Sequence, residues 1–131
     1  MRRVRTFLPA LGLVAAALVL VAACGDAGAS GTPGPTIPAG AVVVTAENRH
    51  FSPETLMLPA GTTFTLALDN KDGDPHNVAI RTKQGFDGDL LFRHDPITKT
   101  IGVFQVGPIA AGTYYFLCEV HPDMHGTVVV Q

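Results

Sequence analysis

The chain has few charged side chains, and basic residues are the scarcer kind. Of its 131 residues, 15% are Asp, Glu, Lys or Arg, and nine Lys and Arg stand against eleven Asp and Glu. Arg2, Arg3 and Arg5 lie at the start of the chain, and without them the net charge is −5 with His counted as neutral. Proteins that bind nucleic acid carry a basic stripe or patch. This composition therefore argues against a nucleic-acid partner.

The sequence also lacks an apolar run long enough to cross a membrane comfortably. The uncharged stretch from Leu11 to Ala23 is shorter than the roughly 20 residues that a transmembrane helix needs. A charged start followed by such a run is typical of a secretory signal, which we place at residues 1–23. The run ends in Val21-Ala22-Ala23-Cys24, which resembles the bacterial lipobox, where cleavage leaves a lipidated cysteine as the new amino terminus. We therefore predict export and a lipid anchor at Cys24 on the extracytoplasmic face of the cell membrane. An ordinary signal peptide, or an uncleaved anchor helix, is the alternative.

Cysteine is scarce, since the chain contains only Cys24 and Cys118. Exported proteins that use cysteine structurally normally carry an even number, paired in disulfides. If Cys24 is acylated, Cys118 has no disulfide partner. A lone thiol in an oxidising compartment then calls for burial in the core or for a bond to a metal ion.

Composition divides the chain into three parts. After the signal, residues 24–40 are small and rich in Gly and Pro, so we expect the predicted lipid-bearing Cys24 to be followed by a disordered tether. From Ala41 onward short apolar or alternating stretches take over, without helical periodicity. The clearest is 63–69, in which Phe64, Leu66 and Leu68 share one face.

Short strands at roughly ten-residue spacing predict one all-β domain over residues 41–131. We expect an antiparallel sandwich of seven or eight strands, with residues 47–54 as a crossing or turn and no long element in residues 82–99. The expected strands are 41–46, 55–58, 63–69, 76–80, 100–106, 113–117 and 127–130.

One short segment collects the ligand types that copper favours. Cys118 ends an apolar aromatic stretch, and His121 and Met124 follow it at intervals of three. Thiolate, imidazole and thioether side chains suit a soft or borderline copper ion. His76, after the turn-forming residues 70–75, is the candidate for a second imidazole. A shared ion would require the ring of His76 within about 6 Å of the sulfur of Cys118, because metal–ligand bonds are near 2 Å.

The segment 112–130, with its Cys-x-x-His-x-x-Met-x-Gly pattern, and the upstream Asp74-Pro-His-Asn-Val78 resemble the type 1 blue copper proteins of the cupredoxin family. The short ligand loop is most similar to that of amicyanins, and the likeness, which extends to plastocyanins, covers roughly residues 41–131. The resemblance implies a Greek-key sandwich or barrel around one Cu(I)/Cu(II) ion. It implies His76, Cys118 and His121 as the trigonal ligands, Met124 as the long axial ligand, and Asn77 as a residue that ties the two ligand loops together.

Each of these residues also has a plainer interpretation. Cys118 could be a buried core thiol, His76 and His121 surface histidines, Met124 a core filler and Asn77 an ordinary turn residue.

Three further histidines and one glycine lie outside the proposed ligand set. His125 in place of Met124 would give a harder copper site, but we interpret His125 as exposed. We expect His94 and His50 to be solvated. Gly126 is expected to let the loop turn sharply into the last strand.

Three classes of function follow. The first is a monomeric, membrane-tethered copper protein that carries single electrons between redox proteins, such as a cytochrome, an oxidase or a dehydrogenase. Copper buffering, delivery or sensing would use the same residues and stays open. An enzyme is not expected. The chain has no His-x-His motif of a multicopper oxidase, and Glu119 alone does not supply the orienting carboxylate and oxyanion hole that a Cys118–His121 hydrolase needs.

Overall fold

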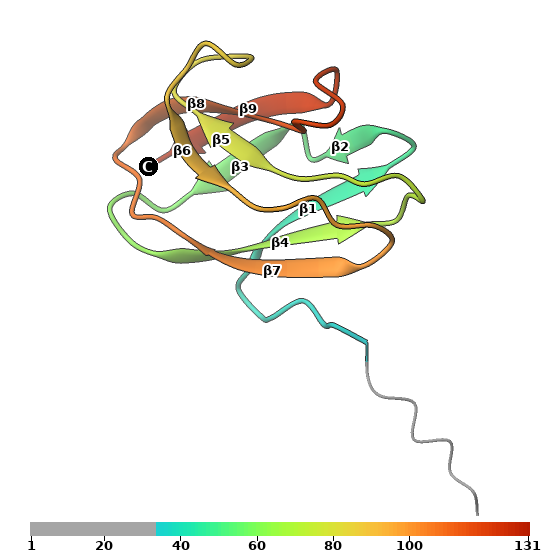
Figure 1. Cartoon of the computed structure of the whole chain (residues 1–131). Helices are drawn as coiled ribbons and strands as arrows, with labels where there is room; N and C mark the ends of the chain where they lie inside the picture. The colour runs from blue at the N-terminus through green and yellow to red at the C-terminus, as the bar shows by residue number, and fades with distance from the viewer. Residues whose placement is uncertain (1–33) are drawn as a thin grey trace, which may run out of the picture. The chain divides into compact units, whose positions relative to one another are not determined.

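The structure is a computed structural model that describes residues 34–131 (Figure 1). The predicted signal, the predicted lipidation site Cys24 and the first part of the predicted tether lie outside the described residues. Residues 34–40 are exposed and precede the first strand. Within the described range the structure has no helix that could cross a membrane.

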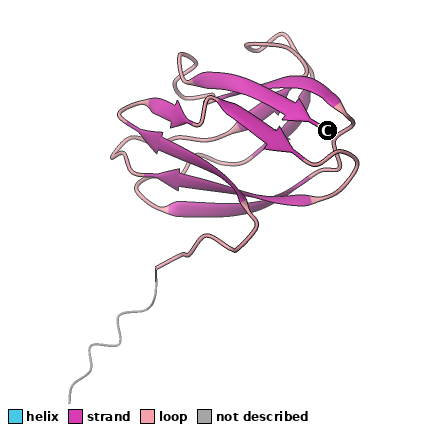
Figure 2. Cartoon of the chain, turned by 180° about the vertical axis from the view of Figure 1, so that it is seen from behind, coloured by secondary structure: helices cyan, strands magenta, loops and turns pink. Residues whose placement is uncertain are grey.

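Nine strands in the described residues form two sheets around one hydrophobic core (Figures 1 and 2). The four-stranded sheet has the order β2-β1-β4-β7, and the five-stranded sheet has the order β3-β9-β8-β5-β6. The strands are β1 Val42–Glu47, β2 His50–Ser52, β3 Thr55–Leu58, β4 Phe64–Asn70, β5 Ala79–Arg81, β6 Leu90–Arg93, β7 Ile101–Val106, β8 Gly112–Leu117 and β9 His125–Val130.

The predicted all-β sandwich is confirmed, with two differences in detail. The sheets are mixed and not antiparallel throughout, because β1 runs parallel to β4 and β3 runs parallel to β9. The two strands that the sequence did not reveal are β2 and β6. Both are short edge strands, and β6 carries mostly exposed side chains and pairs with β5 across a register shift. An edge strand of this kind lacks the alternating apolar pattern on which a prediction depends.

The core explains why β4 was the clearest strand in the sequence. Phe64, Leu66 and Leu68, which were predicted to share one face, are all buried, and they belong to one cluster that joins the facing sides of both sheets. Phe51 and Phe116, from opposite sheets, pack with ring centroids 5.3 Å apart. Burial of such side chains stabilises the fold by about 1.5–3 kcal/mol each, so the core gives the sheets a firm relative placement.

Gly126 has a different role from the one predicted. It has no left-handed backbone conformation and lies inside β9, so it does not create a sharp turn. A Cβ atom at this position would lie 2.3 Å from the backbone oxygen of Glu54 and 2.4 Å from the ring of Phe116. The glycine is therefore needed for close packing of β9 against its neighbours.

We expect Gly126→Ala to lower the free energy of unfolding of the metal-free protein by about 1–3 kcal/mol, the usual cost of overpacking. Denaturant unfolding followed by circular dichroism measures the change. Gly73→Ala is the matched control, because a Cβ at Gly73 meets no atom within 4 Å and its backbone is not left-handed. Equal stabilities of the two variants would contradict the packing role of Gly126.

Candidate metal centre

The register of two antiparallel strands brings the predicted ligands together. In the β5–β8 pair, Ala79 lies opposite Leu117. Asn77 and His76 precede β5, and Cys118 and Glu119 follow β8. Because antiparallel neighbours run in opposite directions, the residues before β5 and those after β8 lie at the same end of the sheet. His76 and Cys118, which are 42 residues apart in the sequence, are brought close together in this way.

The distances are those of a compact ligand cluster. Nδ1 of His76 lies 3.7 Å from Sγ of Cys118 and 3.1 Å from Nδ1 of His121. The ligand atoms of these three residues all lie within 4.8 Å of one another, and residues 34–131 contain no other such group of His, Cys, Asp and Glu. The predicted approach of His76 to Cys118 is therefore confirmed.

Burial differs among the residues of the cluster. His76 and Cys118 are fully buried, Met124 is nearly so, and His121 is half-buried. Cys118 forms no disulfide within the described residues. Burial lowers the pKa of His121 below its ordinary value, and the nearby Arg49 guanidinium lowers it further. A neutral imidazole is the form that binds metal.

The loop between Cys118 and Met124 closes on itself. The amide of Cys118 donates to the carbonyl of Met124 at 2.9 Å, and the amide of Met124 donates to the carbonyl of His121 at 2.9 Å. Cys118 and Met124 both belong to the hydrophobic core cluster. His125, the next residue, is exposed as predicted.

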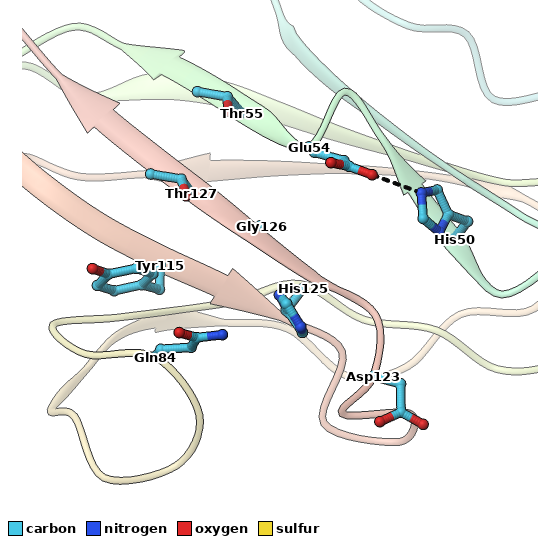
Figure 3. Close-up of a pocket in the computed structure, with 9 residues that line it drawn as sticks. All are labelled: His50, Glu54, Thr55, Gln84, Tyr115, Asp123, His125, Gly126 and Thr127. Carbon is cyan, nitrogen blue, oxygen red and sulfur yellow. Dashed lines mark hydrogen bonds and ion pairs between the residues drawn. The ribbon is translucent and has the colours of Figure 1, made fainter.

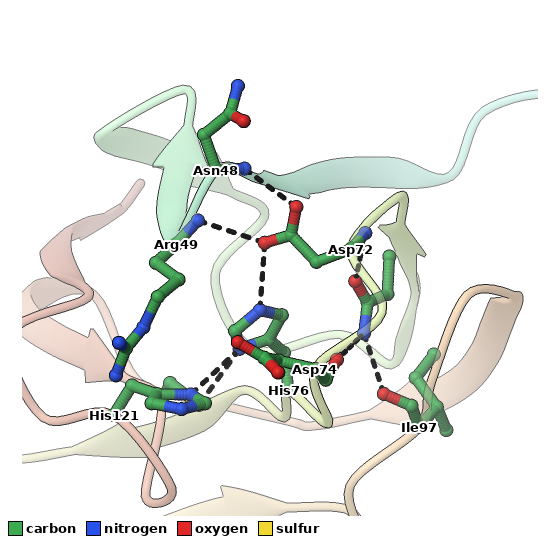
Figure 4. Close-up of polar contacts among 9 residues, drawn as sticks. Asn48, Arg49, Asp72, Asp74, His76, Ile97 and His121 are labelled. Carbon is green, nitrogen blue, oxygen red and sulfur yellow. Dashed lines mark hydrogen bonds and ion pairs between the residues drawn. The ribbon is translucent and has the colours of Figure 1, made fainter.

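Asp72 orients His76, although no sequence motif marks it for this role. Its Oδ2 atom accepts a hydrogen bond from Nε2 of His76 at 2.9 Å (Figure 4). Because a carboxylate only accepts, Nε2 carries the ring proton and Nδ1 presents its lone pair to Cys118 and His121. Metal-binding histidines are typically oriented by a carboxylate of this kind.

Asp72 is itself held by a strained turn. The amides of Asn48 and Arg49, both with positive φ, donate to its two oxygens at 2.7 and 2.9 Å (Figure 4). The Arg49 amide, more than any other contact, holds the pKa of Asp72 below its usual range. The β1–β2 turn of one sheet is thereby connected to the imidazole that faces Cys118.

Backbone contacts fix the chain around His76 as well. His76 and Ile97 exchange two backbone hydrogen bonds, of 3.0 and 2.9 Å. The buried side chain of Asn70 donates to the carbonyls of Asp74 and Ile97 and accepts from the amide of Asp72. The turn of residues 70–75 is therefore packed in one conformation.

The prediction that His94 is solvated was wrong. His94 is only 8% exposed, and its ring stacks on Phe104 at 3.8 Å between centroids. Its Nε2 atom accepts from the amide of Val78 at 3.0 Å, while Nδ1 donates to the carbonyl of Asp95 at 2.7 Å. Burial lowers the pKa of His94. Residues 82–99 have no alternating apolar pattern, and β6 carries mostly exposed side chains, so nothing in the sequence indicates that the ring of His94 is buried.

Asn77 is buried and lies between the two ligand-bearing segments. Its Oδ1 atom accepts from the amide of Glu119 at 2.8 Å, and its Nδ2 group donates to Oε2 of Glu119 at 3.0 Å. Burial raises the pKa of Glu119, but hydrogen bonds from Asn77 and Arg81 outweigh it and leave the pKa below its ordinary value.

A cavity of about 470 Å³ is lined by two of the histidines that do not join the cluster (Figure 3). His50 and His125 line it together with Glu54 and Asp123. His50 is exposed, as predicted, and pairs with Glu54 at 2.9 Å. Both side chains of this pair are about 70% exposed, so the pair contributes little to stability.

The cluster fits a copper ion in chemistry and in size. Two nitrogens that share one metal at about 2.0 Å each are separated by at most about 4 Å, and the two Nδ1 atoms are 3.1 Å apart. The cluster consists of a thiol buried against two imidazoles, and Asp72 directs the Nδ1 lone pair of His76 toward the other two ligands. This donor set suits Cu(I) and Cu(II) alike.

Comparison with known proteins agrees with this donor set. The family model described as "Cupredoxin-like domain" matches residues 13–130. Amicyanin of Paracoccus versutus is 35% identical over 95 residues, covering 72% of this chain and 68% of that protein. Amicyanin-alpha of Methylorubrum extorquens is 31% identical over 94 residues, covering 72% of this chain and 75% of that protein.

Solved structures show the same relationship. The crystal structure of Paracoccus versutus amicyanin superposes with a TM-score of 0.53 at 30% identity, over 72% of this chain and 85% of that one. Auracyanin A of Chloroflexus aurantiacus, described as a "blue" copper protein, has a TM-score of 0.60 at 17% identity, over 70% and 98% of the two chains. The second likeness concerns the fold alone. With the cluster, these relatives confirm the predicted cofactor, one copper ion. The chain belongs to the cupredoxin family, whose members are typically single-copper electron carriers.

Proposed function

We propose that this protein is a mononuclear type 1 copper protein that carries single electrons between redox partners at the outer face of a bacterial membrane. The observation that supports it most strongly is the meeting of His76, Cys118 and His121, with separations of 3.7 and 3.1 Å, at a site where His76 and Cys118 are buried and His121 is half-buried. Bound copper supplies the redox chemistry, since it takes up one electron as Cu(II) and gives it back as Cu(I).

In this proposal His76, Cys118 and His121 would hold the copper ion, and Met124 would be its fourth and weakest ligand. The burial of Met124 supports its role as a ligand, because Met124 packs in the same core cluster as Cys118. His125 is exposed and lines the separate cavity with His50. The alternative with His125 as axial ligand would require the start of β9 to rotate away from its pairing with Leu117.

The polypeptide holds these ligands in place by contacts that do not involve the metal. Asp72 and Ile97 fix His76, and the amide of Cys118 is bonded within its own loop. A site fixed in advance changes little between oxidation states, so little free energy goes into rearrangement during electron transfer. The proposed ligand set also leaves no open position for a substrate, and we therefore do not propose an enzyme.

His121 is the proposed ligand that lies nearest to solvent. It is half-buried, while the other three proposed ligands are buried. An electron would enter and leave most directly through its ring. We propose that a redox protein of the cytochrome, oxidase or dehydrogenase class docks over this residue, with the chain itself as a monomer.

The predicted lipid at Cys24 would keep the domain at the membrane. This part of the proposal rests on the sequence Val21-Ala22-Ala23-Cys24 and on the charged, then apolar, residues before it. The predicted tether of residues 24–40 would let the domain reach partners in the same membrane.

Copper buffering or delivery would use the same ligands in a different way. Delivery requires ligands that leave the metal easily. Here two of the three clustered ligands are fully buried and braced by hydrogen bonds, an arrangement that slows ligand exchange. The observation favours electron transfer.

Spectroscopy and voltammetry test the proposed function directly. The copper-loaded protein should show the intense visible absorption of a thiolate–Cu(II) bond and a reversible one-electron couple. Cys118→Ala should lose both signals, because the sulfur supplies the charge-transfer transition. His125→Ala is the control and should keep both. Tight capture of Cu(I) without reversible redox activity would favour the buffering function instead.

Asp72→Ala should weaken copper binding by roughly 10–100-fold, the usual effect of removing a residue that orients a metal ligand. Asp74→Ala removes the same charge two residues away, and the Asp74 contact to Asn70 is made by its backbone carbonyl. That variant should bind copper almost as tightly as the parent protein. Competition titration with a chelator gives both affinities, and equal losses would show that only charge matters.

Cys24→Ser should move the full-length protein from the membrane fraction to the soluble fraction of an expressing bacterium, because serine is not lipidated in place of cysteine. Cys118→Ser should remain with the membrane. Detergent partitioning and immunoblotting measure the distribution. Continued membrane association of Cys24→Ser would instead support an uncleaved anchor helix.

A further inference from the structure

We propose that Arg49 is a specificity-determining residue at the exposed edge of the proposed copper site, and that it fits a redox partner whose docking surface carries carboxylates. This role rests on the proposed function, because a partner that exchanges electrons through His121 must dock on the surface around that ring. Arg49 is exposed and lies in the turn between β1 and β2. It is not a proposed ligand, and its contribution is to the choice of partner.

The guanidinium group of Arg49 is directed toward His121 (Figure 4). Burial is the main cause of the lowered pKa of His121, and Arg49 has the largest effect among the charged groups around it. The carboxylates of Asp74 and Asp72 act in the opposite sense and more weakly. At the proposed ligand nearest to solvent, the electrostatic effect of this cation therefore exceeds that of either anion.

The backbone of Arg49 belongs to the network that orients the buried imidazole. Its amide donates to Oδ2 of Asp72 at 2.9 Å, and the same oxygen accepts from Nε2 of His76 at 2.9 Å. Asn48 and Arg49 have φ angles of 54° and 58°, a conformation that is uncommon outside glycine. Because both amides of this turn are bonded to Asp72, the side chain of Arg49 extends from a fixed base beside the site.

The charge of Arg49 has no partner within residues 34–131. The ion pairs in this part of the chain involve His50, His76, Arg81 and Arg93, and Arg49 takes part in none of them. A partner that covers His121 would also remove water from the guanidinium group of Arg49. Burial of an unpaired charge is costly, so a docking surface without an anion at this point is disfavoured.

A carboxylate on the partner would remove this cost. Guanidinium and carboxylate groups can form two parallel hydrogen bonds, which add geometric specificity to the attraction between the charges. Val120 and Pro122, on either side of His121 in the chain, are exposed and offer apolar contacts. Arginine and apolar side chains are commonly combined in protein interfaces. The expected partner therefore has an apolar contact surface bordered by Asp or Glu side chains.

The acidic composition of the chain does not oppose this assignment. Without Arg2, Arg3 and Arg5 the net charge is −5, which repels an acidic partner at long range. At physiological salt, charges more than about 8 Å away are largely screened. The groups at the contact therefore dominate the choice of partner, and there the effect of Arg49 exceeds that of Asp74.

The first test is NMR of the metal-free protein with hexacyanochromate(III), a paramagnetic trianion that broadens the signals of groups it approaches. Broadening should be strongest at the Arg49 amide and the His121 ring, and Arg49→Gln should reduce it roughly fivefold at low salt. The control Lys83→Gln removes an equal charge from an exposed residue beyond the end of β5 that is remote from His76, and it should leave the broadening unchanged. Equal broadening in Arg49→Gln and the parent protein would overturn the proposal.

Two further measurements belong to this test. Arg49→Lys keeps the charge and should retain most of the broadening, and a loss as large as that in Arg49→Gln would contradict an electrostatic role. Citrate should restore the signals of the parent protein more effectively than sodium chloride at the same ionic strength, because its carboxylates pair with the guanidinium group. Citrate no more effective than chloride would overturn the assignment of carboxylates. This competition needs no variant, so it decides even if Arg49→Gln does not fold.

The second test is oxidation of the copper-loaded Cu(I) protein by hexacyanoferrate(III), a trianion, and by tris(1,10-phenanthroline)cobalt(III), a trication. Each oxidant takes one electron and leaves Cu(II). A change in reduction potential affects both rate constants in the same direction, so their ratio reports the charge at the docking surface. Arg49→Gln should lower the ratio of the hexacyanoferrate to the cobalt rate constant roughly tenfold at low salt, and the difference should shrink at high salt. Lys83→Gln should leave the ratio unchanged.

Failure of this role can be distinguished from failure of the proposed function. A parent protein without thiolate–Cu(II) absorption or a reversible one-electron couple would refute the proposed function, and the hexacyanochromate experiment would still decide whether Arg49 recognises anions. A reversible couple together with equal rate ratios in Arg49→Gln and Lys83→Gln would overturn the assignment of the partner and leave the proposed function intact.

Discussion

The antiparallel register between β5 and β8 is the constraint on which the rest of this molecule depends. It sets Ala79 against Leu117, and so it brings two segments that are distant in sequence to one end of the five-stranded sheet. A slip of one residue would turn every side chain of β5 to the opposite face. It would take Val78 and Ile80 out of the core cluster and His76 away from Cys118. The free energy of core burial therefore also enforces the geometry of the site.

The register brings the segments together, but two carboxylates determine how the ligands lie. Asp72 accepts from Nε2 of His76 on the side away from the cluster, and Glu119 joins Asn77 to the segment that follows Cys118. Neither carboxylate is free to move, since backbone amides hold the first and arginines hold the second. Both are ionised groups with several donors, the condition under which a partly buried charge stabilises a structure.

The sequence reveals those parts of the site whose residues lie close together in the chain, and it does not reveal those that depend on contacts between distant segments. Cys118, His121 and Met124 lie within seven residues, so their grouping was visible without knowledge of the fold. His76 could be named from the residues only as a candidate second imidazole, because no local pattern connects it to Cys118, and the resemblance to a family then supported it. No sequence pattern reveals the roles of Asp72, Glu119 and Arg81, since these roles arise from contacts that join the β1–β2 turn, β5 and the loops. The burial of His94 likewise depends on Val78 and Phe104, which are distant from it in the sequence. The parallel pairings of β1 with β4 and of β3 with β9 follow from the order of strands in the sheets, which strand patterns alone do not determine.

The burial of His94 shows that support for the site extends one layer further. Its ring nitrogen accepts from the amide of Val78 and its carbonyl accepts from Asn77, so it holds the chain on both sides of the Asn77–Val78 peptide. A lone buried amide without an acceptor would cost about 1–3 kcal/mol, and β6 is too short to supply one from its backbone. A neutral histidine is suited to this position because one ring nitrogen accepts while the other donates, here to Asp95. The stacked Phe104 ring belongs to β7 of the other sheet. The segment that carries His76 is therefore braced by both sheets, from Asp72 and the β1–β2 turn on one side and from His94 and Phe104 on the other.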